Sequence, residues 1–178
     1  RLAAKFGVTR EAMDKFALRS HQNAARATEE GIFKDEISPV DGHTTDNGIK
    51  GDSSLEKLSS LRPAFVRPHG THTAANSSFL TDGAAATLIM SEEKALELGY
   101  QPKAEIAHTT FVGVDPFEEL LLGPAYAIAK LLKSANMTMK DIDVWEIHEA
   151  FAGQVRESFS GNLLSFSMFH SKTLIHTH

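Results

Sequence analysis

The chain has 178 residues, of which 42% are hydrophobic, so it is long and apolar enough to bury a core. Its formal net charge of -5 argues against a nucleic-acid-binding surface, and it has no run of about 18 apolar residues that would cross a bilayer. The absence of cysteine excludes disulfides and thiolate metal sites.

The first third of the chain predicts helices followed by a polar loop. Residues 2–6 have the pattern of a helix end that a glycine stops. Residues 9–31 predict a second helix, opened by a threonine cap and closed by a glycine, with apolar side chains at helical spacing. On this helix His21 is predicted to face solvent. Residues 34–53 predict a loop, and the leucines within 55–61 predict a short helix.

The middle of the chain predicts strands that alternate with helices. Residues 84–90 form an almost continuous apolar run, which is typical of a strand buried on both faces. Residues 104–112 predict a second strand and residues 144–147 a third. Helices are predicted between them over 91–99, opened by a serine cap, and over 124–136, opened by a proline. This alternation predicts a layered α/β domain with a parallel or mixed sheet.

One histidine stands where the third strand meets the next helix. A helix is predicted over 149–155, so His148 would lie at the end of a strand and near the positive end of a helix dipole. A side chain there is suited to stabilising negative charge on a substrate oxygen. On position alone, a histidine that only packs at the turn explains the pattern as well.

A second candidate site is the turn Asn76-Ser77-Ser78. Small hydroxyl and amide side chains before a strand allow a ligand amide to approach the backbone closely. A turn that only starts the next strand remains the alternative.

Three ordered blocks of sequence resemble the thiolase family. Residues 145–154, Trp-Glu-Ile-His-Glu-Ala-Phe-Ala-Gly-Gln, are similar to its Asn/His-Glu-Ala-Phe signature, in the histidine variant. Residues 70–86 resemble its Gly-Thr-Val-Thr-Ala-x-Asn-x-Ser-x-x-x-Asp-Gly-Ala run, with His72 where relatives often have Val. A third block, 113–116 followed by 123–124, falls between them in the family's order.

The resemblance implies a fragment of a thiolase, since family subunits are about twice as long. The fold class expected is a thiolase-like layered α/β fold that is incomplete. Residues 1–78 would be the end of the N-terminal domain with the loop domain that covers coenzyme A. Residues 79–157 would be the first part of the C-terminal domain, and 158–178 a divergent tail. The family's two catalytic cysteines and its Gly-His-Pro-x-Gly histidine would lie outside this chain.

The resemblance also implies an activity and roles for four residues. The activity is thiolytic cleavage of a 3-ketoacyl-coenzyme A through an acyl-cysteine intermediate, with coenzyme A as substrate and no cofactor. His148 would polarise the substrate oxygen as a catalytic residue, and Ser78 matches the serine that touches the pantetheine part of coenzyme A. Phe151 beside His148 and Leu120 would line the substrate pocket, although both are explained equally well as core. His176 and His178 are too few ligands to predict a metal site.

Within the family, the amino-acid sequences of these blocks are most similar to those of members that act on long-chain 3-ketoacyl substrates in mitochondria. The implied partners are coenzyme A or acyl-coenzyme A, a second thiolase subunit, and an α subunit with hydratase and dehydrogenase activities; no nucleic acid is expected. The implied location is the matrix, with peripheral association at the inner membrane. A hypothesis from another class is a non-catalytic thiolase-like protein that binds acyl-coenzyme A or a partner subunit without turnover.

Overall fold

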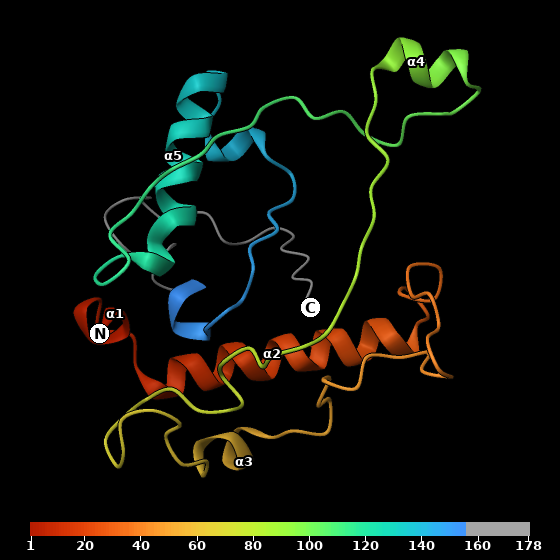
Figure 1. Ribbon diagram of the computed structural model, residues 1–178. Coiled ribbons are helices and arrows are strands. Elements are labelled where there is room, and N and C mark those ends of the chain that lie inside the picture. Colours follow the sequence, from red (N-terminus) through yellow and green to blue (C-terminus); the bar gives the residue numbers. More distant parts are fainter. Residues whose placement is uncertain (156–178) are drawn as a thin grey trace.

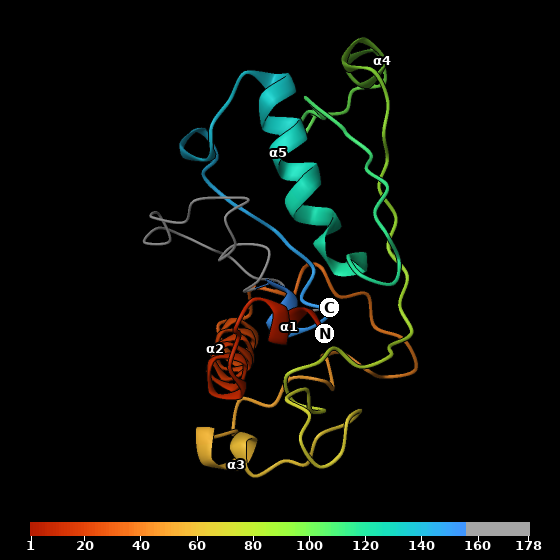
Figure 2. The same ribbon diagram turned by 90° about the vertical axis from the view of Figure 1, so that its left-hand side faces the viewer.

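The computed structural model describes residues 1–155, which arrange short helices and extended segments around one long helix (Figure 1). The helices are α1 (Leu2–Lys5), α2 (Arg10–Glu29), α3 (Leu55–Ser59), α4 (Glu92–Glu97) and α5 (Gly123–Ala135), with the 3-10 turns η1 (Leu120–Leu122) and η2 (Met139–Asp141). Residues 152–155 are also helical. Figure 2 views α2 almost along its axis, with α3 on one side and α5 on the other.

The predicted helices are confirmed, and local capping explains where they begin and end. The side chains of Thr9, Ser54 and Ser91 each accept a hydrogen bond from a backbone N–H in the first turn of α2, α3 and α4. Asn136 ends α5 in the left-handed conformation, at φ +53°. The last predicted helix begins at residue 152 rather than 149.

The predicted sheet is absent from residues 1–155. Segments 84–90, 104–112 and 144–147 are extended but unpaired, and the described residues contain only two isolated bridges, one of them Ser77–Phe151. The prediction that 84–90 is buried on both faces is therefore wrong for these residues. A helix closes its own backbone hydrogen bonds, whereas a strand needs a neighbour to supply them, and these segments have none within the described chain.

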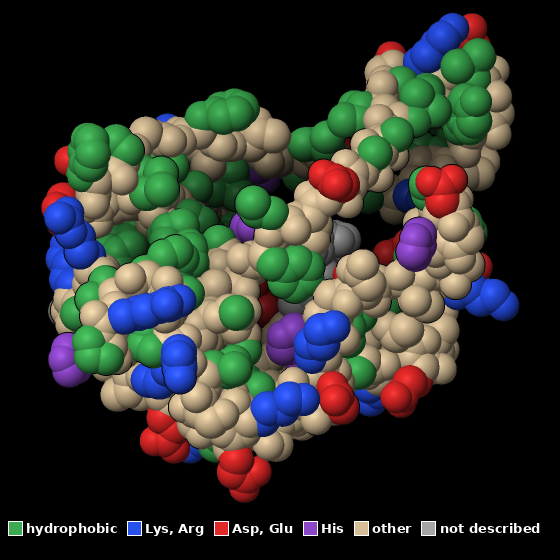
Figure 3. All heavy atoms as spheres, turned by 60° about the horizontal axis from the view of Figure 1, so that its bottom comes forward, with side chains coloured by type: hydrophobic (Ala, Val, Ile, Leu, Met, Phe, Trp, Pro, Cys, Tyr) green, Lys and Arg blue, Asp and Glu red, His purple; other side chains and the backbone are tan. Residues whose placement is uncertain are grey.

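The extended segments leave apolar side chains in solvent. The trace leaves α2 after residue 78, runs outward to α4 and returns to α5 (Figure 1), and hydrophobic side chains cover the projecting arm around α4 (Figure 3). Leu88 is 71% exposed and Phe111 87% exposed. Exposed apolar segments with free backbone groups are sites of association.

We therefore expect the purified chain to self-associate as its concentration rises. Replacing Leu88 and Phe111 with Lys should shift this association to higher concentration, because charge opposes strand pairing and apolar burial. Sedimentation velocity over a dilution series measures the effect. A chain that stays monomeric at all concentrations would contradict the prediction.

The hydrophobic core lies where α1, the start of α2 and residues 152–155 meet. Its buried members are Ala3, Met13, Phe16, Ala152 and Val155. A Cβ at Gly153 would lie 2.9 Å from the sulfur of Met13, so the absence of a side chain at residue 153 lets these two helical segments pack without displacing the Met13 side chain. The core thus fixes the His-Glu-Ala-Phe segment against α2.

Candidate functional site

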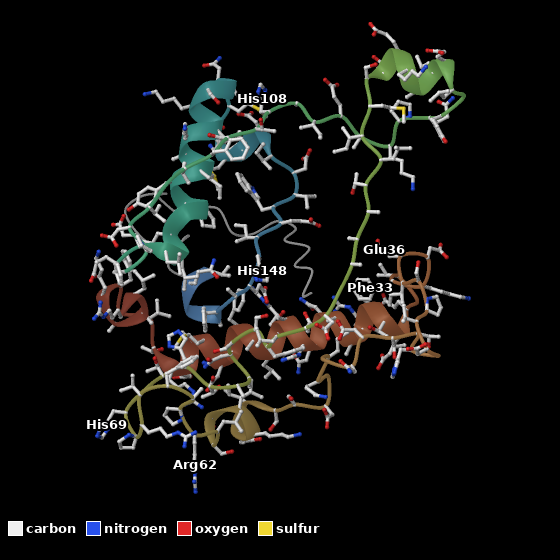
Figure 4. All side chains as sticks on the ribbon, viewed as in Figure 1. Phe33, Glu36, Arg62, His69, His108 and His148 are labelled. Carbon is white, nitrogen blue, oxygen red and sulfur yellow. The ribbon has the colours of Figure 1, made fainter. Side chains whose placement is uncertain are left out.

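A cavity of about 700 Å³ lies between α2, α3 and the turn at 76–78. It has the size of a ligand pocket. Six of its lining residues come from the two predicted site motifs: Asn76, Ser77, Ser78, His148, Glu149 and Ala152. His148 lies where the extended segment approaches the middle of α2 (Figure 4).

Two backbone hydrogen bonds bring the two motifs together. The N–H of Ser78 donates to the carbonyl oxygen of Ala150 at 2.9 Å, and the N–H of Ala152 donates to that of Asn76 at 3.0 Å. They form the antiparallel bridge between Ser77 and Phe151. The exposed side chains of Ser78 and His148 therefore line one wall, within reach of a ligand in the cavity.

A buried polar network holds the turn at 76–78 against α2. The side-chain amide of Asn76 donates to the Asp14 carboxylate at 2.9 Å and accepts from the N–H of Thr73 at 2.8 Å. Asp14 is fully buried and forms an ion pair with Arg10 at 2.7 Å. The Arg10 guanidinium also donates to the carbonyl oxygen of Leu58 at 2.8 Å, at the end of α3. One chain of hydrogen bonds thus links α3, α2 and the turn.

The sequence analysis did not predict this network. Asp14 looks like a solvated charge on an amphipathic helix, and its burial depends on Asn76, which is 62 residues away. The only local signal is the spacing of Arg10 and Asp14, which places opposite charges on neighbouring turns of a helix.

Glu149, which is partly buried, also lies in the cavity wall. One carboxylate oxygen accepts a hydrogen bond from the Ser20 hydroxyl at 2.8 Å, while the other is buried without a partner among the described residues. Burial raises the pKa of Glu149, and the Ser20 hydrogen bond and the nearby Arg19 charge only partly oppose this. The hydrogen bond to Ser20 ties the residue that follows His148 to α2.

The prediction that His21 faces solvent is wrong. His21 is half-buried and lines the cavity, and its Nδ1 accepts the N–H of Lys50 at 3.3 Å. Burial lowers the pKa of His21, and the neighbouring Lys50 charge adds to this effect. A neutral imidazole is the form that accepts this hydrogen bond, so His21 holds the loop that contains Lys50 on α2.

Phe151 and Leu120 lie together in a different, smaller cavity of about 280 Å³. Phe151 therefore does not share the cavity of His148, although the two are only three positions apart in the sequence. Its ring contacts His72 edge-on, with ring centroids 5.5 Å apart, and Phe65 with centroids 6.3 Å apart. Of the four predicted site residues, Ser78 and His148 thus line the larger cavity, and Leu120 and Phe151 line the smaller one.

Residues 1–155 contain no group of three His, Cys, Asp or Glu side chains placed to hold a metal ion. The predicted tail 158–178, with His176 and His178, lies outside the described residues. No helix in the described part of the chain is long and apolar enough to cross a membrane.

Two family models match most of the chain. The thiolase N-terminal domain matches residues 1–93, and the thiolase C-terminal domain matches residues 100–165. The chain belongs to the thiolase family.

The chain is similar to curated thiolases over about a third of their length. It is 54% identical over 159 residues to the bovine mitochondrial trifunctional enzyme subunit beta, which covers 87% of this chain and 33% of the relative. It is 58% identical over 162 residues to a probable 3-ketoacyl-CoA thiolase of Caenorhabditis elegans, and this match covers 87% of this chain and 36% of the relative.

Solved structures confirm the predicted fold class. Human mitochondrial 3-ketoacyl-CoA thiolase in complex with CoA has a TM-score of 0.87 at 36% identity, covering 97% of this chain and 43% of that chain. The dimeric peroxisomal thiolase of Saccharomyces cerevisiae has a TM-score of 0.84 at 38% identity, and the match covers 89% of this chain and 42% of the yeast chain. The described residues therefore have the conformation of part of a thiolase, including segments that find no strand partner here.

Proposed function

We propose that this chain forms part of the site of a 3-ketoacyl-CoA thiolase, which cleaves a 3-ketoacyl-CoA with coenzyme A to give acetyl-CoA and a shortened acyl-CoA. The observation that carries the proposal is the meeting of Ser78 and His148 in the wall of one ligand-sized cavity, joined by the hydrogen bonds between residues 76–78 and 150–152. The names of the related thiolases support the same reaction.

In this reaction a cysteine thiolate attacks the keto carbon, and negative charge develops on the keto oxygen. The chain contains no cysteine, so the nucleophile would come from outside these 178 residues. His148 would stabilise the negative oxygen as one hydrogen-bond donor of an oxyanion hole, and a donor of this kind is most effective when it is fixed beforehand. The hydrogen bond from Ser20 to Glu149 supports that role, because it anchors the neighbouring residue.

The larger cavity would hold coenzyme A. Ser78 would bind a pantetheine amide, since its hydroxyl is exposed beside the Asn76 turn. Lys50 and Lys57 line the same cavity and would supply positive charge for the phosphates. The smaller cavity, with Leu120 and Phe151, would receive the acyl chain, because most of its lining is apolar.

We also propose the partners and location that the bovine relative's name suggests: an α subunit of a trifunctional complex, in mitochondria. A second thiolase subunit is proposed from the yeast structure, which is described as dimeric. We further propose that the protein associates peripherally with the matrix face of the inner mitochondrial membrane.

Coenzyme A titration tests the binding part of this function. The 178-residue chain is tethered at low density on a sensor surface, which prevents self-association, and coenzyme A is passed over it. Replacing Ser78 with Ala should weaken binding about five-fold, because one neutral hydrogen bond contributes about 1 kcal/mol.

Ser134 is exposed on α5 and lines neither cavity, so its replacement with Ala is the matched control and should leave binding unchanged. If the unaltered chain fails to bind coenzyme A, or binds it equally well after the Ser78 change, the proposed site is wrong.

A further inference from the structure

The smaller cavity contains one polar side chain whose ring has no hydrogen-bond partner. Most of the lining is apolar, and Leu120, Phe151 and Phe65 belong to it. His72 lies among them, half-buried, with its ring edge-on to Phe151 at 83° between the ring planes. Within residues 1–155 the His72 ring makes no hydrogen bond.

The other polar side chains of the lining each have at least one polar partner. Arg1 and Glu118 form an ion pair with each other at 3.1 Å. The side-chain oxygen of Gln154 accepts the N–H of Phe151 at 3.5 Å. Among the polar side chains of this lining, His72 is thus the one without a hydrogen bond or ion pair within residues 1–155, so its ring nitrogens depend on solvent or on whatever occupies the cavity.

A ligand that fills this cavity must displace that solvent. Burial already lowers the pKa of His72, so the ring is neutral at pH 7 and carries one N–H donor and one acceptor nitrogen. A hydrocarbon tail offers neither an acceptor nor a donor in place of the displaced water. Burying polar atoms without replacement hydrogen bonds opposes binding.

We propose that His72 determines which acyl groups this cavity accepts, by selecting against long, purely apolar acyl tails. This inference rests on the proposed function, because it takes the occupant of the cavity to be the acyl part of a coenzyme A thioester. The residue acts on the acyl tail alone, so it should not change affinity for coenzyme A itself, whose proposed contacts lie in the larger cavity.

The test compares coenzyme A, acetyl-CoA and palmitoyl-CoA as ligands of the tethered full chain. Replacing His72 with Val should strengthen palmitoyl-CoA binding about ten-fold, the equivalent of about 1.4 kcal/mol, and leave coenzyme A binding unchanged. Replacing His72 with Asn removes similar volume but keeps a polar group, so it should leave palmitoyl-CoA binding close to that of the unaltered chain.

A matched control is His69→Val, because His69 is exposed on the same segment and lines neither cavity (Figure 4). This change should affect none of the three ligands. Equal palmitoyl-CoA affinity for His72→Val and the unaltered chain would overturn the inference, as would an equal gain for His72→Asn, which would indicate volume rather than polarity. Failure of every variant to bind coenzyme A would instead contradict the proposed function, and the inference with it.

Discussion

Replacing His148 with Ala is expected to lower turnover about 100- to 1,000-fold, which is the usual effect of removing one donor from an oxyanion hole. The measurement needs a thiolase with its cysteines. A suitable protein is the bovine trifunctional enzyme subunit beta with residues 1–155 of this chain in place of its matching segment. Cleavage of a 3-ketoacyl-CoA by coenzyme A is followed by the loss of substrate absorbance.

Replacing His148 with Asn should be far less damaging, within about ten-fold of the starting rate, because an amide N–H can also donate to the substrate oxygen. His69 provides the control, since it is exposed, lies outside the predicted strands and lines neither cavity. His69→Ala should leave turnover unchanged. Equal rates for the His148→Ala and unaltered proteins would remove His148 from the mechanism.

Replacing Asp14 with Ala is expected to lower the free energy of unfolding by about 3 kcal/mol, the lower end of what breaking a buried ion pair costs. Arg10 would keep its bonds to carbonyl oxygens at the end of α3, which limits the loss. The Asn76 amide would lose its buried acceptor, and the turn that carries Ser78 would lose its anchor on α2. Urea unfolding at low protein concentration, followed by far-ultraviolet circular dichroism, measures the change.

Two variants make this result specific to the network. Asp14→Asn should have an intermediate effect, because its amide oxygen can still accept from Asn76 while the charge that pairs with Arg10 is gone. Asp35 is exposed and forms no ion pair in the described residues, so Asp35→Ala should change stability by less than about 0.5 kcal/mol. A loss below about 1 kcal/mol for Asp14→Ala would show that the network contributes little.

The helices and the family motifs were predictable from the sequence. Thr9 and Ser91 cap helices through hydrogen bonds that reach only three residues along the chain, so their effect can be recognised without knowing the fold. The two site motifs were identified by their residue order, which led to Ser78 and His148. Nothing local, however, indicated which backbone groups join these two motifs.

Tertiary structure alone decided what the remaining residues do. Asp14 is buried because Asn76 and Arg10 satisfy its carboxylate, and Asn76 is remote in sequence. Phe151 and His148 are near neighbours along the chain, yet the bridge between Ser77 and Phe151 directs them to different cavities.

The apolar run at 84–90 shows most clearly which properties the sequence predicts and which depend on tertiary structure. The sequence predicted an extended segment here from its uninterrupted apolar run, and the segment is extended in the structure. Whether it is buried depends on strands that must lie beside it, and residues 1–155 supply none. Helices follow from hydrogen bonds that the local sequence closes by itself, whereas sheets and shared cavities depend on contacts between distant segments.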